Sequence, residues 1–122
     1  MINRSIFAAP DVVLDQRPWG SFERLVLNDN VTVKIITVAP SQRLSLQHHS
    51  LRDEWWTVLD QGLNVEVGDR SWLPDVGERI WIPRGTRHRV GNACSQVARF
   101  LELAFGVFEE EDIERLADDY RR

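Results

Sequence analysis

The sequence is poor in cysteine and in long apolar runs. Its 122 residues include one cysteine, Cys94, so an internal disulfide framework and a cysteine-rich zinc site are both excluded. Uninterrupted apolar stretches reach only a few residues, far short of the roughly 20 that a membrane-spanning helix needs. Because the N-terminus has no long apolar region before a cleavage site, we expect a cytoplasmic protein rather than a secreted one.

The charge balance excludes a further class of partner. Fourteen arginines and one lysine, Lys34, are outnumbered by 19 acidic residues, which gives a formal net charge of −4 without any basic block. A nucleic-acid partner is therefore not expected, because phosphate backbones are bound by basic surfaces. Arginine suits carboxylate and phosphate oxygens, but a bias in genomic composition explains the high arginine share more simply.

The pattern of β-prone runs predicts an all-β fold in a single domain. No repeat or linker divides the chain, and its length fits one hydrophobic core. Short β-prone runs alternate with turn residues at the spacing of about 8–12 residues that is typical of sandwiches and barrels. We expect the domain to cover residues 17–122, with residues 1–16 as an N-terminal arm or an extra strand. The expected strands are 21–27, 31–38, 44–49, 55–59, 63–67, 79–82, 88–90 and 97–105.

The C-terminal segment has a different periodicity. Its apolar residues fall at helical spacing, and they are Ile113, Leu116, Ala117 and Tyr120. Acidic residues at 109–112 and arginines at 121–122 would suit the two ends of a helix dipole. This pattern predicts a short amphipathic helix packed on the β domain.

The three histidines lie in two of the β-rich segments. Gln47 and His49 share one face of a strand because side chains alternate, and His48 then points to the opposite face. Glu54 starts the next strand and can return to the first face, while His88 follows a tight turn. Two imidazoles, one carboxylate and one amide oxygen suit a divalent metal, with zinc, iron, manganese, nickel and cobalt all chemically possible. A lone histidine is usually structural, so this hypothesis depends on the combination.

Two motifs carry a resemblance to a known family. Residues 77–92 match the second cupin motif, G-x5-P-x-G-x2-H-x3-N, at every specified position. Gln47, His49 and Glu54 match the first motif, with glutamine in place of its first histidine. With this substitution, the first motif resembles that of the cupin domain of type II phosphomannose isomerases. Further similarities to that branch lie at 17–22 (RPWGSF), Lys34, 44–47 (LSLQ), Arg52, Trp56, 112–113 (DI), Arg115 and 118–120 (DDY).

The resemblance implies a fold, a metal and a reaction. The fold would be a double-stranded β-helix, or jelly-roll barrel, and the metal, most often zinc, would be held by Gln47, His49, Glu54 and His88. The family interconverts mannose 6-phosphate and fructose 6-phosphate. Arg52 matches an arginine that is important for catalysis, which implies stabilisation of an enediolate or a phosphate. Many relatives carry the domain behind a nucleotidyltransferase, which this sequence lacks, so nucleotide transfer is not expected.

Other basic residues are candidates for the same site. Lys34 lies in an apolar strand, where desolvation would favour the neutral amine and a role as proton shuttle or phosphate contact. An ordinary outward lysine on an edge strand is an equal alternative. Three arginines near the second motif could gather phosphate or lie solvated in loops, and these are Arg84, Arg87 and Arg89.

The sequence also departs from the family and leaves other functions open. Trp55 stands where relatives commonly have histidine, and Ala104 replaces a common glutamine. A non-catalytic sugar-binding cupin is one alternative, because aromatic faces stack on sugar rings. Another metal-dependent cupin enzyme, such as a dioxygenase or decarboxylase, is less compatible with Gln47. We expect a sugar-phosphate isomerase that forms a homodimer through at least one of Trp19, Trp72 and Trp81.

Overall fold

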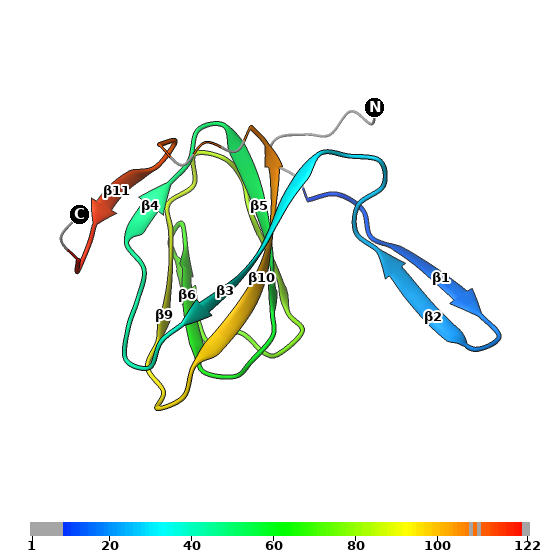
Figure 1. Ribbon diagram of the computed structural model, residues 1–122, viewed down its shortest axis with the longest axis horizontal. Helices are drawn as coiled ribbons and strands as arrows, with labels where there is room; N and C mark the ends of the chain where they lie inside the picture. Colours follow the sequence, from blue (N-terminus) through cyan, green and yellow to red (C-terminus); the bar gives the residue numbers. More distant parts are fainter. Residues whose placement is uncertain (1–8, 108, 110, 121–122) are drawn as a thin grey trace.

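The computed structural model describes residues 9–107, 109 and 111–120 (Figure 1). This part of the chain contains strands and no helix, which confirms the all-β fold class. No segment in it forms a helix able to cross a membrane. The strands are β1 (Val13–Arg17), β2 (Gly20–Arg24), β3 (Val31–Val38), β4 (Leu46–His48), β5 (Arg52–Val58), β6 (Leu63–Val67), β7 (Arg70–Trp72), β8 (Arg79–Ile82), β9 (His88–Asn92), β10 (Ala98–Gly106) and β11 (Glu114–Ala117).

Two antiparallel sheets face each other to form the jelly-roll barrel. One sheet has the strand order β3-β10-β5-β8 and the other β11-β4-β9-β6-β7 (Figure 1). Alternating apolar residues from both sheets fill the space between them, with Val58, Val65 and Phe100 almost completely buried. This apolar packing occupies one part of the interior and leaves a polar cavity in another. The barrel expected from the spacing of the β-prone runs is therefore present.

A second apolar cluster covers the outer face of the first sheet. Trp55, Leu103 and Phe105 are buried there, with Trp81 packed against them. Residues that flank the β1–β2 hairpin, among them Leu25, add to this cluster. The outer side of the sheet thus has its own small core, which uses the side chains that alternate with the interior ones.

The β1–β2 hairpin extends away from the barrel (Figure 1). All five residues of β2 are exposed, and Trp19 in the turn is 73% exposed. An ion pair between Glu23 and Arg79 ties the hairpin to β8. The expected boundary between arm and domain, at residues 16 and 17, falls inside strand β1. Residues 1–8 of the expected arm lie outside the described part of the chain.

The two other tryptophans considered for a dimer contact pack within the chain. The indole nitrogen of Trp72 donates to Glu78 at 2.8 Å, and the Arg70 guanidinium lies 4.2 Å from the Trp72 ring centroid. Trp81 packs edge-on against Trp55 in the outer cluster. Of the three tryptophans, Trp19 is therefore the one whose ring remains largely exposed.

The predicted C-terminal helix is wrong. Residues Glu114–Ala117 form strand β11, which pairs with β4 through the Cα registers Glu114↔His48 and Arg115↔Gln47. A helix of this length has little stability of its own, whereas pairing satisfies the backbone groups along the open side of β4. Tertiary pairing therefore overrides the helical spacing, and Arg121 and Arg122, expected at the helix end, lie outside the described residues.

Candidate metal centre

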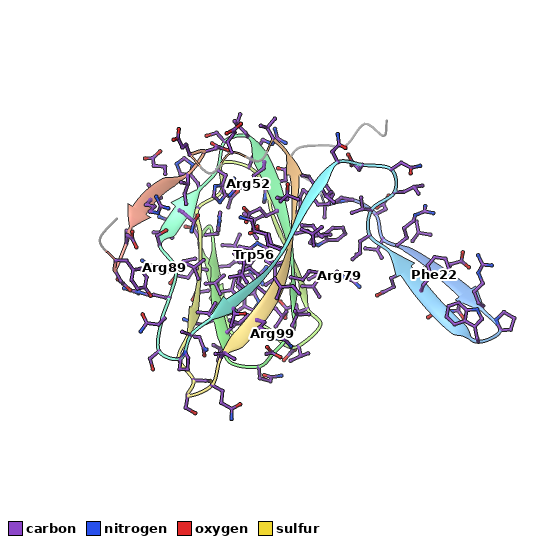
Figure 2. All side chains as sticks on the ribbon, viewed as in Figure 1. Phe22, Arg52, Trp56, Arg79, Arg89 and Arg99 are labelled. Carbon is purple, nitrogen blue, oxygen red and sulfur yellow. The ribbon has the colours of Figure 1, made fainter. Side chains whose placement is uncertain are left out.

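Strand pairing brings the residues of the two sequence motifs together inside the barrel. Gln47 in β4 is paired with His88 at the start of β9. His49 follows β4 directly, and Glu54 lies near the start of β5 in the facing sheet. All four residues line one cavity of about 140 Å³ between the sheets. Figure 2 shows Arg52 and Trp56 of β5 pointing into this interior.

Three of these residues form a compact group of possible metal ligands. One ligand atom each from His49, Glu54 and His88 lie within 4.8 Å of one another, and all three side chains are buried. The Nε2 atom of His49 is 3.2 Å from one carboxylate oxygen of Glu54, and the Nε2 atom of His88 is 3.7 Å from the other. Two imidazoles and a carboxylate are the ligand set of many catalytic zinc sites, so the group fits a divalent ion.

Backbone carbonyl groups fix both histidines in the form that binds metal. The Nδ1 atom of His49 lies 2.7 Å from the carbonyl oxygen of Asp112, and that of His88 lies 3.0 Å from the carbonyl oxygen of Thr86. A carbonyl oxygen only accepts, so each Nδ1 carries the proton and each Nε2 presents a lone pair toward Glu54. Burial lowers the pKa of both imidazoles, which favours the neutral form.

Glu54 and Gln47 each offer an oxygen atom to the site, the first from a charged group and the second from a neutral one. Burial works to raise the pKa of Glu54, but the charge that His88 and His49 carry when protonated and the hydrogen bonds from Glu102 and Arg52 outweigh it and hold this pKa below its ordinary value. Once the imidazoles are neutral, the bonds from Glu102 and Arg52 are the contacts that still favour the charged form. Glu54 is therefore a carboxylate. The amide nitrogen of Gln47 lies 3.2 Å from the Ser45 hydroxyl, so its amide oxygen is the atom left for coordination.

Arg52 touches two of the candidate ligands. Its Nε donates to Glu54 at 3.0 Å, and its Nη2 lies 3.2 Å from Nε2 of His49. A third bond runs from Nη1 to the carbonyl oxygen of Glu109 at 3.3 Å. The side chain is buried and lines the cavity. Arg52 therefore forms an ion pair with Glu54 and also lies next to the group of possible metal ligands. Asp53, the next residue along the chain, pairs with Arg84 instead.

Glu102 is a site residue that sequence reasoning missed. It lies on β10, opposite Lys34 of β3 and Trp56 of β5, and both Glu102 and Lys34 line the cavity. Burial and then the charge of Glu54 raise the pKa of Glu102 to about 8, so it carries a proton at neutral pH and shares a hydrogen bond with Glu54. An available signal was its place in the apolar run 97–105, where alternation puts it on the same face as Phe100.

The remaining candidates lie in different places. Arg89 lines the cavity and donates to the carbonyl oxygens of Leu44 and Ala117. Arg87 forms an exposed ion pair with Asp69, and Arg84 is held by Asp53. His48 faces away from the cavity and lies 3.0 Å from Glu114.

The two residues that depart from the family pattern, Trp55 and Ala104, lie on opposite faces of the sheet. Trp55 belongs to the outer apolar cluster, so its ring is on the far side of the sheet from the cavity. Ala104 is paired with Glu54 and is buried on the interior side of β10. The aromatic ring that favoured a sugar-stacking module is thus not available to a ligand in this cavity.

The barrel and its buried group of histidines and glutamate define a cupin, and comparison with known proteins agrees. The capsular polysaccharide assembling protein CapF from Staphylococcus aureus matches with a TM-score of 0.63 at 17% identity, over 88% of this chain and 34% of that one. A cupin-superfamily sugar phosphate isomerase from Silicibacter pomeroyi matches with a TM-score of 0.58 at 21% identity, over 63% of this chain and 51% of that one. At these identities the likeness shows the fold.

The sequence comparison is more specific. Residues 11–118 match the family described as mannose-6-phosphate isomerase, C-terminal, and the chain belongs to this family. The alginate biosynthesis protein AlgA from Pseudomonas aeruginosa is 37% identical over 107 residues, which are 87% of this chain and 22% of that protein. A mannose-1-phosphate guanylyltransferase from Escherichia coli is 36% identical over the same share of each chain. The chain thus spans about a fifth of the length of these curated relatives.

Proposed function

We propose that this domain is a metal-dependent isomerase that interconverts mannose 6-phosphate and fructose 6-phosphate. The observation that carries the proposal is the buried group of His49, Glu54 and His88, with both Nε2 atoms directed at one carboxylate inside a cavity. Membership of the mannose-6-phosphate isomerase C-terminal family supports the choice of substrate. We further propose zinc as the ion, with Gln47 as its fourth protein ligand.

The reaction needs groups that bind charge and groups that move a proton. Aldose and ketose interconvert through an enediol or enediolate, in which a proton passes between adjacent carbons. A divalent ion at this centre would supply positive charge for the oxygen on which negative charge develops. The chain itself must hold the phosphate, orient the sugar and transfer the proton.

Arg52 and Lys34 are suited to these tasks. The Arg52 guanidinium is a planar donor, and its place against His49 and Glu54 brings it next to any group bound at the metal centre. Lys34 enters the same cavity from β3 in the register opposite Glu102. We assign Arg52 to stabilisation of the enediolate or phosphate and Lys34 to proton transfer or phosphate contact.

Glu102 completes the electrostatic balance of the cavity. Its carboxyl group is protonated at neutral pH and can donate to the Glu54 carboxylate. This bond leaves Glu54 as the single negative charge facing the two neutral imidazoles and Arg52. One carboxylate with two neutral imidazoles leaves a divalent ion with a net positive charge, which a reaction through an oxyanion requires.

The proposal is tested by following mannose 6-phosphate by NMR with chelator-treated protein, before and after zinc or cobalt is restored. We expect fructose 6-phosphate to appear only with the restored metal and to be lost in His88→Ala. Binding of the sugar phosphate without conversion would identify a non-catalytic module instead. Equal conversion by the chelator-treated protein would refute the role of the metal.

A further inference from the structure

We propose that Asp112 is the positioning residue of the metal centre and that it acts by docking a C-terminal strap onto the ligand-bearing loop. The strap comprises residues 111–120, and the ligand loop is His49–Arg52. This inference rests on the metal site proposed above, and it concerns a residue that is itself 63 positions from the ligand it holds.

Asp112 binds three consecutive residues of the ligand loop. Its carboxylate accepts the backbone N–H of Ser50 at 3.1 Å and that of Leu51 at 2.8 Å. Its carbonyl oxygen accepts the Nδ1 proton of His49 at 2.7 Å. One residue therefore sets the path of the loop and also the ring orientation and tautomer of the ligand at its start.

The two histidine ligands differ in how they are held. His88 bonds to Thr86, only two residues earlier, so its orientation is built into the turn of the second motif. His49 takes the partner of its Nδ1 from the strap, and the next two residues of its loop, Ser50 and Leu51, are exposed. Loss of the Asp112 contacts should therefore loosen one metal ligand and leave the other in place.

Apart from the strand pairing of Arg52 with Gly106, the backbone of the loop accepts two further hydrogen bonds, and both leave this role to Asp112. The N–H of Gly85 donates to the carbonyl oxygen of His49, and the N–H of Val107 donates to that of Leu51. Both go to carbonyl oxygens of the loop and touch neither the imidazole of His49 nor the N–H groups of Ser50 and Leu51. The close approach at Leu51 requires glycine at 106, where a Cβ would lie 2.5 Å from the Leu51 carbonyl oxygen.

The strap is also fixed at sites remote from the ligand loop, which provides a matched control. Asp119 accepts a bond from the Arg43 guanidinium at 3.0 Å, and the Tyr120 hydroxyl lies 2.7 Å from Gln42. Asp119 lies in the same segment and carries the same charge as Asp112, but its side chain bonds to Arg43 and not to the ligand loop. The substitution Asp119→Asn therefore removes the same kind of charge without touching the loop. The comparison separates positioning of His49 from general attachment of the strap.

The experiment measures zinc dissociation constants by competition with a chromophoric chelator, together with the visible spectrum of the cobalt form. Asp112→Ala keeps the backbone carbonyl that bonds to His49 but removes the carboxylate that holds Ser50 and Leu51, so this carbonyl oxygen and the imidazole lose their fixed relative position. We expect this variant to bind zinc about 10-fold more weakly and to show altered cobalt bands, because the partner of a metal-bound histidine is no longer held in place. Asp112→Asn should lose less, and Asp119→Asn should stay within about twofold of the parent. If Asp112→Ala fails to fold, Asp112→Asn decides the question.

Two results would overturn the inference. The first is a folded Asp112 variant that binds zinc as tightly as the parent, with an unchanged cobalt spectrum. The second is an Asp119→Asn variant that loses as much affinity as the Asp112 variants. A parent protein that binds no zinc is a different result, because it refutes the proposed metal site itself.

Discussion

The substitution Glu102→Gln should make the metal-free protein more stable, and by an amount that grows with pH. The pKa of Glu102 is about 8 in the fold, against an ordinary value of 4.5. Between these values the folded chain holds a proton that the unfolded chain has released. The stability of the parent therefore falls as pH rises through this window, by at most about 1.4 kcal/mol per pH unit for one full proton.

The size of the effect follows from the width of the window. From pH 5 to pH 8 the upper limit is about 4 kcal/mol, and solvent entry into the cavity should reduce this to about 1–3 kcal/mol. Glutamine stays neutral, and its amide can still donate to Glu54 as the protonated carboxyl does. We therefore expect equal stabilities at pH 5 and a more stable variant at pH 8.

The assay is urea unfolding of both proteins in chelator at pH 5, 6.5 and 8, followed by tryptophan fluorescence. The lowered pKa values of His49 and His88 destabilise the fold as pH falls below about 6.5, but both proteins share this term and it cancels in the difference. A difference that does not change with pH, or a variant that is less stable at pH 8, would refute the assignment of a buried proton to Glu102.

Three further predictions concern metal, turnover and association. Elemental analysis should find one divalent ion per chain in the parent and much less in His49→Ala and His88→Ala; equal contents would exclude the site. Arg52→Lys keeps the charge but loses the planar fork, so it should retain metal while turnover falls about 100- to 1000-fold, and parental turnover would remove Arg52 from the mechanism. We also predict a homodimer in sedimentation, weakened by Trp19→Ser because that ring is exposed; a monomeric parent at micromolar concentration would contradict this.

Much of the barrel could be predicted because its strands have clear local signals. The expected runs 31–38, 63–67 and 79–82 coincide with β3, β6 and β8. In the interior-facing strands, alternation follows directly from burial on one side. Strand β11 could not be found in this way, because its partner β4 lies more than 60 residues earlier and its side chains are largely exposed. Without a buried face, a strand leaves no period of two in the sequence.

The residues of the candidate site also differ in how far the sequence could predict them. The spacing of Gln47, His49 and Glu54 and the turn before His88 were readable because each motif is local. Asp112 and Glu102 act through contacts across the fold, and their roles depend on which strands are paired. Trp55 is a position where alternation alone gives the answer, because it lies between Glu54 and Trp56 on one strand and therefore faces the outer cluster.

The most direct test of the central claim is the isomerase activity of a single preparation measured as a function of its metal content. Chelator-treated protein receives zinc or cobalt in steps, and the conversion of mannose 6-phosphate is measured at each step. The account predicts activity that rises in proportion to bound metal and reaches its plateau at one ion per chain. Activity that is independent of metal content, or no conversion when one ion is bound at His49, Glu54 and His88, would contradict it.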